Sequence, residues 1–426
     1  MSKLIIQGGH KLEGELSIHG AKNSALPILA ATLMCKGESV IHNCPVLSDV
    51  DASIKILEYL GCKIKRDGST ISVDSSNIIN SDIPENLMNE MRSSIIFLGS
   101  LISQCNKTSL SFPGGCELGP RPIDLHLSAF KKMGVSIIEE HGFLNCSRKA
   151  KLKGSKIALS FPSVGATENI LLAAVTAKGN TIISNAAREP EIVDLAAFLI
   201  KCGAKIRGAG HDNIYIEGVN SLTPCEHRVI PDRIATSTFM SSAAITGGDI
   251  IIKDTFPNHL WTIFPIFEEV GCKLTLNKNS LRIKGNNQLK GASTIRTMPY
   301  PGFPTDLQAP IMSMCTIAKG TTIFVENIFE SRYKHVCELN RLGAKICVEG
   351  KVAIVYGVDG LSGATVRCTD LRGGASLVVA GLVAEGDTEI LDIKHIDRGY
   401  ECIEDKLNSI GANIKRIETS EDIIIE

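Results

Sequence analysis

One pattern recurs six times along the chain, and it constrains the fold more than any other feature of the sequence. In each copy an amphipathic segment ends at a glycine, and aliphatic or β-branched residues follow. The six glycines, spaced by 68–73 residues, are Gly61, Gly134, Gly203, Gly271, Gly343 and Gly411. Glycine readily takes the left-handed conformation that ends many helices, so each copy predicts a helix, a sharp stop and a strand.

A second kind of segment alternates with the first and carries no charged residue. Clear examples are residues 24–34, 169–177, 236–245 and 376–384. A helix without a charged face is expected to be buried. Each repeat therefore supplies one buried helix, one amphipathic cover helix and several short strands.

The repeats predict an α/β fold with two domains. Three repeats would form each domain, an inside-out α/β barrel in which sheets and cover helices surround the buried helices. A chain of 426 residues also exceeds the usual size of a single core. We predict a first domain at 22–230 and a second at 1–21 plus 231–426. The first strand, about residues 3–18, precedes the first buried helix, and chain exchange would let it complete the last repeat.

Charge and composition exclude several classes of protein. The net charge of −1 does not favour a general binder of nucleic acid or acidic membranes. The N-terminus lacks the apolar stretch of a signal peptide, and no apolar run reaches the roughly 20 residues that span a bilayer. We therefore expect a cytoplasmic protein. The 14 cysteines form no CxxC pair and match no metal spacing, so they read as reduced thiols, and no metal or cofactor is expected.

Lysine and arginine occur unusually often where helices are predicted to begin. The partial positive charge of a helix N-terminus disfavours cations there. The cations at predicted helix starts are Lys22, Arg92, Arg121, Arg188, Arg233, Arg332, Arg372 and Arg398. One interpretation is that each is a solvated or locally paired surface residue. The recurrence of the pattern instead predicts that both domains direct these starts towards one cleft that binds a ligand with several phosphates or carboxylates.

The third buried helix opens without a cation, at Ser163, Val164 and Gly165. Small residues leave backbone N–H groups accessible, and such a helix start suits a diphosphate. The alternative is that Ser163 is an ordinary N-cap. The sequence leaves both interpretations open.

Residues 113–122 form an irregular loop with three glycines and three prolines. Cys116 stands in this loop beside Gly, Glu and a nearby Arg, whereas most other cysteines stand among aliphatic residues. A glycine-containing loop can carry a catalytic group into a site, and a thiol near cations can donate a proton. The alternative is a free cysteine without a role. The sequence shows no histidine that could be recognised as a catalytic partner of Cys116, so it does not indicate a cysteine protease.

The repeat and several motifs together resemble the enolpyruvyl transferase family, in particular its UDP-N-acetylglucosamine branch. The resemblance runs from Gly8 to about residue 416. The motifs that carry it are Lys22-Asn23, the loop of Cys116 with Arg121-Pro122, and residues 163–167, 188–191, 231–233, 303–306 and 398–407.

The resemblance implies an activity and two alternatives to it. The implied reaction moves the enolpyruvyl group of phosphoenolpyruvate to the 3-hydroxyl of UDP-N-acetylglucosamine and releases phosphate. It proceeds by addition and elimination through a tetrahedral ketal, and it is the first committed step of peptidoglycan synthesis. One alternative is transfer to shikimate 3-phosphate, and the other is a non-catalytic paralogue that binds the nucleotide sugar. The oligomeric state stays open.

The resemblance also implies catalytic roles. Lys22, Arg121 and Arg398 would hold the phosphate and carboxylate of phosphoenolpyruvate, with Asn23 beside them. Cys116 would protonate the methylene carbon, form a covalent adduct with the same substrate, and be alkylated by the antibiotic fosfomycin.

Asp306 resembles the base that takes the proton of the sugar hydroxyl. Its place at a helix start favours the ionised carboxylate, which is a weak base. Its alternative role is helix capping, and Asp370 is an alternative proton acceptor.

The implied nucleotide-sugar site draws on both domains. Its residues are Asn23, Arg92, Arg121, Pro122, Ile123, Asp124, Leu125, Ser163, Val164, Gly165, Asp306 and Ile328. Arg332 and Arg372 resemble further cations of the cleft. Phe161 departs from the pattern, because some relatives have lysine there, so the nucleotide pocket is expected to differ in detail.

Overall fold

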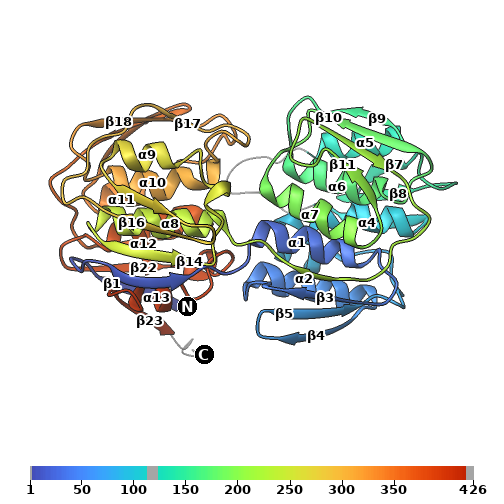
Figure 1. Ribbon diagram of the computed structural model, residues 1–426, viewed down its shortest axis with the longest axis horizontal. Helices are drawn as coiled ribbons and strands as arrows, with labels where there is room; N and C mark the ends of the chain where they lie inside the picture. The colour runs from blue at the N-terminus through green and yellow to red at the C-terminus, as the bar shows by residue number, and fades with distance from the viewer. Residues whose placement is uncertain (1, 113–122, 419–426) are drawn as a thin grey trace. The chain divides into compact units, whose positions relative to one another are not determined.

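The computed structural model describes residues 2–112 and 123–418 (Figure 1). Its contacts divide the chain into two compact units. The described part of one, here called the N-terminal unit, is residues 20–112 and 123–230. The C-terminal unit comprises residues 2–19 and 231–418. Each unit is described by itself.

The N-terminal unit contains three buried helices, three longer cover helices and three sheets. The buried helices are α1 (Lys22–Thr32), α4 (Phe97–Gln104) and α6 (Val164–Ala174), with the short η1 (Arg92–Ile96) before α4. The outer helices are α2 (Ser48–Leu60), α3 (Glu85–Glu90), α5 (Asp124–Lys132) and α7 (Pro190–Lys201). One sheet has the order β13-β3-β5-β4, from Glu226–Arg228, Glu38–His42, Thr70–Asp74 and Lys63–Asp67. The second has the order β6-β8-β7, from Lys107–Ser111, Phe143–Ser147 and Ser136–Glu140. The third has the order β11-β12-β10-β9, from Lys205–Arg207, Asn213–Glu217, Asn180–Ser184 and Lys156–Ala158.

The C-terminal unit repeats this architecture. Its buried helices are α8 (Arg233–Ile245), α10 (Gln308–Cys315) and α12 (Leu371–Gly381), and its cover helices are α9 (Phe264–Glu269), α11 (Val336–Arg341) and α13 (Ile403–Asn408). One sheet has the order β15-β16-β14-β2, from Lys273–Leu276, Ser280–Lys284, Asp249–Lys253 and Glu13–Ser17. The second has the order β17-β18-β20-β19, from Ile295–Arg296, Thr321–Val325, Val352–Tyr356 and Lys345–Glu349. The third has the order β21-β22-β1-β23, from Thr365–Arg367, Asp387–Leu391, Ser2–Gln7 and Asn413–Glu418.

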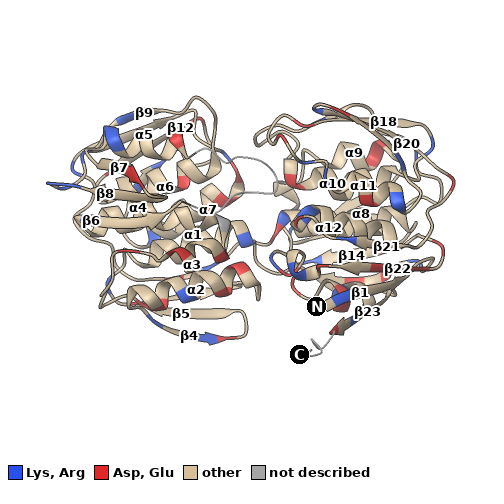
Figure 2. Cartoon of the chain, turned by 180° about the vertical axis from the view of Figure 1, so that it is seen from behind, with Lys and Arg blue, Asp and Glu red and all other residues tan. Residues whose placement is uncertain are grey.

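The buried helices form the centre of each unit. Each carries at most one Lys, Arg, Asp or Glu, so they appear almost entirely tan in Figure 2. All residues of α8 and α10 are buried. Burial of about 25 cal/mol per Å² of apolar surface is the main force that holds such a core together. The predicted class, with helices inside sheets and cover helices, is confirmed.

The first strand was expected to complete the last repeat, and this is confirmed for β1 alone. It pairs antiparallel with both β22 and β23, with Ile5 opposite Glu389 and Lys415. The prediction is wrong for β2, which pairs parallel with β14 of the fourth repeat. The turn near Gly9, whose φ is +86°, lies between the two strands and lets the chain change sheets.

The six marker glycines all end cover helices with positive φ, from 93° to 107°. We expect Gly134→Ala to lower the free energy of unfolding by about 1–2 kcal/mol, because the added Cβ meets nothing and only the backbone is strained. Gly61→Ala should cost more, since its Cβ would lie 2.7 Å from the Asn77 carbonyl oxygen. Urea unfolding of both variants measures the difference, and equal losses would contradict the steric part of the argument.

Candidate active site

Lys22 begins α1 and is buried rather than solvated. Its Nζ donates to Oδ2 of Asp49, in the first turn of α2, at 2.9 Å. The two residues are 8% and 2% exposed. A buried cation at a helix start needs such a carboxylate partner. The interpretation of Lys22 as a solvated surface residue is therefore wrong, and local pairing is what the structure shows. Asn23, the next residue, is exposed.

The buried carboxylate of Asp194 fixes the start of α1 through three hydrogen bonds. Asp194 of α7 accepts from Ser24 Oγ at 2.5 Å, from His227 Nε2 at 2.9 Å and from the Ile230 backbone N–H at 3.1 Å. These bonds hold the first turn of α1 against α7 and β13. No feature of the sequence indicated this role for Asp194, because its partners are 33 to 170 residues away.

The start of α6 is capped by Ser163 and still has two backbone N–H groups without an acceptor among the described residues. Ser163 Oγ accepts from the Ala166 N–H at 3.3 Å, so the capping interpretation is confirmed. The N–H groups of Val164 and Gly165 have no acceptor among the described residues. The capped helix therefore still offers two N–H groups to an anion. Phe161, which stands where some relatives have lysine, is 42% exposed.

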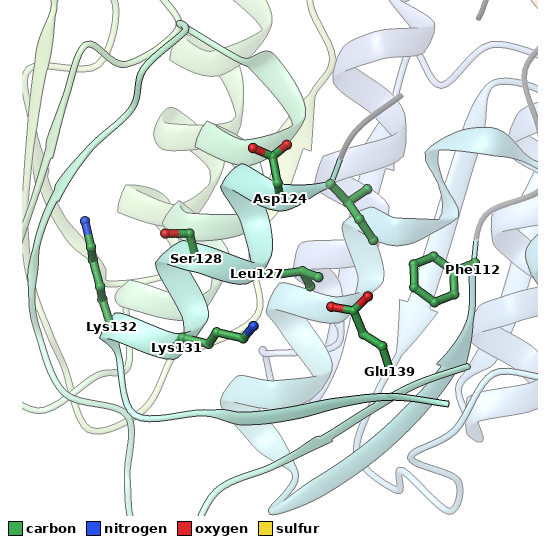
Figure 3. A pocket seen from close by; sticks show the side chains of 8 residues that line it. Phe112, Asp124, Leu127, Ser128, Lys131, Lys132 and Glu139 are labelled. Atoms are coloured by element: carbon green, nitrogen blue, oxygen red, sulfur yellow. The ribbon is translucent and has the colours of Figure 1, made fainter. Parts of the chain in front are cut away.

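Ile123 and Asp124 are among the residues that line a hollow of about 670 Å³ beside α5. Figure 3 labels Asp124 at this hollow. Leu127 of α5 and Phe112 and Glu139 across from it face this hollow. Leu125, the other described residue of the predicted segment, is half-buried. The residues Ser163, Val164 and Gly165 do not line the hollow, so it is distinct from the α6 start.

In the C-terminal unit, Asp306 is held between two buried guanidinium groups. It lies in η3 (Thr305–Leu307), directly before α10. Its Oδ1 accepts from Arg332 Nη2 at 2.8 Å, and its Oδ2 accepts from Arg372 Nη2 at 3.2 Å. Both arginines are 2% exposed. Two ion pairs favour the ionised carboxylate. They therefore agree with the expectation that Asp306 would be a weak base.

Asp370 serves as the N-cap of α12. Its Oδ1 accepts from the N–H groups of Arg372 and Gly373, both at 3.1 Å. The Arg372 guanidinium lies 5.4 Å from the centre of the Tyr400 ring. Burial opposes its charge, but Tyr400 and Asp306 raise the pKa of Arg372 above its ordinary value. Arg372 therefore stays a fixed cation, and one oxygen of Asp370 is occupied by capping.

Glu326 shapes the segment that carries Ile328. This buried carboxylate accepts from the N–H groups of Ile328 at 2.8 Å and Phe329 at 3.1 Å. It also accepts from Thr305 Oγ1 at 3.0 Å, next to Asp306 in the chain. The position of half-buried Ile328 is thus coupled to that of Asp306. The sequence did not indicate this role of Glu326, because a single Glu after a strand is a common surface feature.

The remaining predicted cations are distributed over both units. Arg233 opens α8 behind its N-cap Asp232, is 8% exposed and lies 5.4 Å from the centre of the Tyr300 ring. Arg398 is half-buried and follows η4 (Ile393–His395). Arg188 pairs with Asp212 at 3.2 Å.

Some predicted residues are not described. Cys116, Arg121 and Pro122 lie outside the described residues, and Arg92 is placed only as the first residue of η1. Among the described site residues, the fold brings Asp306, Arg332 and Arg372 together in the C-terminal unit. Lys22 and Asn23, which are neighbours in the chain, lie in the N-terminal unit.

Within the described part of the chain, no group of three His, Cys, Asp or Glu side chains is arranged to hold a metal ion. Among the same residues, no helix combines the length and apolar character needed to cross a membrane.

Two buried histidines predict a dependence of stability on pH. Burial lowers the pKa of His126 and of His335 to about 4, although Asp124 and Asp370 respectively raise it. Between about pH 6.5 and 4 the unfolded chain binds protons that the folded chain does not. Each histidine should therefore contribute stability that is complete above pH 6.5 and falls by about 1.4 kcal/mol per unit as the pH decreases.

Urea unfolding between pH 7 and pH 5 tests this dependence. Burial raises the pKa of Glu168, so this residue acts in the opposite sense. The useful quantity is thus the difference between the unmodified chain and His126→Gln. We expect a shallower decline in the variant, and parallel declines would contradict the assignment to His126.

Comparison with known proteins places the chain in a family. The family model of EPSP synthase (3-phosphoshikimate 1-carboxyvinyltransferase) matches residues 6–407. The chain therefore belongs to the EPSP synthase family of enolpyruvyl transferases, as its motifs predicted. Within this family it is 51% identical to UDP-N-acetylglucosamine 1-carboxyvinyltransferase 2 of Caldanaerobacter subterraneus subsp. tengcongensis, over 98% of this chain and 100% of the relative. It is 48% identical to UDP-N-acetylglucosamine 1-carboxyvinyltransferase of Finegoldia magna, over 98% and 99%.

Solved structures share the fold. The enolpyruvyl transferase NikO from Streptomyces tendae superposes with a TM-score of 0.88 at 24% identity and covers 97% of this chain and 98% of its own. EPSP synthase from Acinetobacter baumannii gives a TM-score of 0.77 at 18% identity, covering 98% and 100%. At such identities the likeness concerns the fold alone.

Proposed function

We propose that this chain transfers the enolpyruvyl group of phosphoenolpyruvate to the 3-hydroxyl of UDP-N-acetylglucosamine and releases phosphate. The observation that carries the proposal is its identity of about half, over nearly the whole chain, with relatives that bear this activity in their names. The described residues add chemistry that fits: a buried lysine, a helix start with free N–H groups, and a carboxylate between two arginines.

The proposed reaction is an addition followed by an elimination. The sugar oxygen adds to C2 of the enol while Cys116 protonates C3, which gives a tetrahedral ketal. Phosphate then leaves and C3 loses a proton, which restores the enol double bond. Lys22, Arg121 and Arg398 would balance the charge on the phosphate and carboxylate, and fixed cations stabilise such charge without reorganisation.

Asp306 has a proposed role in orienting the acceptor. Its carboxylate would accept a hydrogen bond from the sugar 3-hydroxyl and remove its proton as the new bond forms. The ion pairs to Arg332 and Arg372 fix the carboxylate in place but reduce its basicity. We therefore propose that positioning of the hydroxyl contributes more than proton affinity does, with Asp370 as the alternative acceptor.

The nucleotide would lie in the N-terminal unit. We propose that its diphosphate binds at the start of α6, where Val164 and Gly165 offer N–H groups, and that residues 121–125 contact the uridine. Asn23 and Ile328 would contact the sugar, and Arg92 would tighten the nucleotide-sugar site.

We further propose a cytoplasmic role in the first committed step of peptidoglycan synthesis. The product of the proposed reaction is an enolpyruvyl nucleotide sugar, which would serve as an early precursor of that polymer. The described cysteines are all free thiols, as expected in a reducing compartment.

The description of the matching family favours one second candidate, transfer to shikimate 3-phosphate. Phosphate release by the purified chain with phosphoenolpyruvate and each acceptor distinguishes the two. We expect release with UDP-N-acetylglucosamine and none above background with shikimate 3-phosphate. The reverse result would replace the proposed acceptor, and no release with either would indicate a non-catalytic nucleotide-sugar binder.

A further inference from the structure

His126 is a buried side chain that the proposed chemistry does not use. It lies on α5, which packs against α6, and it is only 5% exposed. Its Nδ1 lies 2.8 Å from Nδ2 of Asn169 on α6. What this ring can offer to a ligand depends on which of its nitrogens carries the proton.

The surroundings of Asn169 determine the orientation of its amide. The backbone N–H of Gly99 donates to Oδ1 at 2.7 Å, so this atom is an acceptor and must be oxygen. The other amide atom, Nδ2, donates to the carbonyl oxygen of Ile95 at 3.0 Å. An amide nitrogen donates and does not accept, so its contact with His126 is a donation to Nδ1. Nδ1 is therefore unprotonated, and the ring proton is on Nε2.

The ring also stays neutral near pH 7. Burial lowers the pKa of His126 to about 4, although Asp124 raises it. Nε2–H is thus a neutral donor whose state is set by Asn169. No hydrogen-bond partner for Nε2 is found among the described residues.

Nε2–H lies beside the first turn of α6. A Cβ built on Gly165 would lie 3.3 Å from Cε1 and 3.5 Å from Nε2 of His126. The N–H groups of Val164 and Gly165 at the same turn have no acceptor among the described residues. Three groups without an acceptor among the described residues, two backbone N–H groups and one ring Nε2–H, therefore belong to the same turn of α6 and the ring packed beside it. Phosphate oxygens are the ligands that such an arrangement suits.

We propose that the Nε2–H group of His126 donates to a phosphate oxygen of the nucleotide diphosphate at the start of α6, and that Asn169 is the positioning residue that holds His126 in the donating tautomer. The inference rests on the proposed function, because the nucleotide sugar supplies the diphosphate. It adds a binding residue that lies beyond the segment 121–125 and explains why residue 165 lacks a side chain.

Calorimetric titration with UDP and with uridine tests the proposal, since only UDP carries the phosphates. His126→Phe removes the donor and keeps the shape of the ring, so UDP should bind about tenfold to a hundredfold more weakly. Uridine affinity should not change. His126→Gln, whose amide can donate from a similar place, should recover part of the affinity that His126→Phe loses. His211→Phe, at an exposed position of the same unit, is the matched control and should leave both affinities unchanged.

Nuclear magnetic resonance of the unmodified chain provides a test that does not depend on a variant that folds. With 15N-labelled histidine, the His126 ring should show a protonated Nε2 and an unprotonated Nδ1. UDP should shift the Nε2–H resonance, and uridine should not.

The outcomes separate this inference from the proposed function. If the unmodified chain binds UDP but His126→Phe binds it equally well, or if UDP leaves the Nε2–H resonance unmoved, the inference is overturned while the proposed function stands. If the unmodified chain binds neither UDP nor UDP-N-acetylglucosamine, the proposed function fails, and this inference fails with it.

Discussion

Cys116→Ala should abolish phosphate release from phosphoenolpyruvate and UDP-N-acetylglucosamine while nucleotide-sugar binding persists. Loss of a general acid typically costs about 10²- to 10⁴-fold in turnover. The thiol has no expected part in nucleotide binding, so calorimetric affinity for UDP-N-acetylglucosamine should change little. Cys347→Ala, at an exposed position of β19, is the matched control and should keep full activity. Full activity of Cys116→Ala would remove the thiol from the mechanism.

Covalent modification gives an independent test of the same residue. Mass spectrometry of the chain after treatment with fosfomycin, or with phosphoenolpyruvate, should show one added group that maps to Cys116. Cys116→Asp retains an acid at this position, so we expect it to keep turnover and to resist fosfomycin. Equal sensitivity of this variant would contradict the assignment of the alkylated thiol.

Asp306→Asn should reduce turnover by about 10²- to 10⁴-fold, because the amide neither accepts the hydroxyl proton nor stays charged. It also leaves Arg332 and Arg372 without the carboxylate that pairs both of them. Because the Asp306 side chain is 28% exposed, solvent screens part of this loss, and we expect about 1–3 kcal/mol of destabilisation. Steady-state kinetics and urea unfolding measure the two effects separately.

A matched control separates the pairing of a carboxylate with buried arginines from its pairing with an exposed arginine. Asp249 also accepts two bonds from one guanidinium, that of exposed Arg282, at 2.7 and 2.8 Å. Asp249→Asn should cost no more than about 1 kcal/mol and should leave turnover unchanged. If Asp306→Asn retains the turnover of the unmodified chain, the proton acceptor must be sought elsewhere, with Asp370 first.

Local patterns predicted the elements well because they depend on neighbouring residues. The uncharged segments are buried helices, and the marker glycines all have positive φ. Sheet membership was less predictable. The segment before the first buried helix contains two strands, and Gly9 between them allows each to join a different sheet. Strand pairing depends on contacts between residues hundreds of positions apart, which no local pattern contains.

The cations at helix starts illustrate the same limit at the level of the site. The sequence placed Lys22, Arg332 and Arg372 at predicted helix starts, and the structure shows that all three side chains are buried. It could not identify Asp49 as the partner of Lys22. Likewise it proposed Asp306 from motif resemblance alone, without the two arginines that hold its carboxylate.

The sixfold repeat, the buried and cover helices and the family follow from the amino-acid sequence alone, because hydrophobic pattern, turn residues and motifs are properties of short segments. The three-dimensional fold was needed to show which carboxylate pairs with which cation, and that the Asn169 amide lies against the ring of His126. Those outcomes arise from side chains that meet across the fold, since burial without water forces each polar group to find a specific partner.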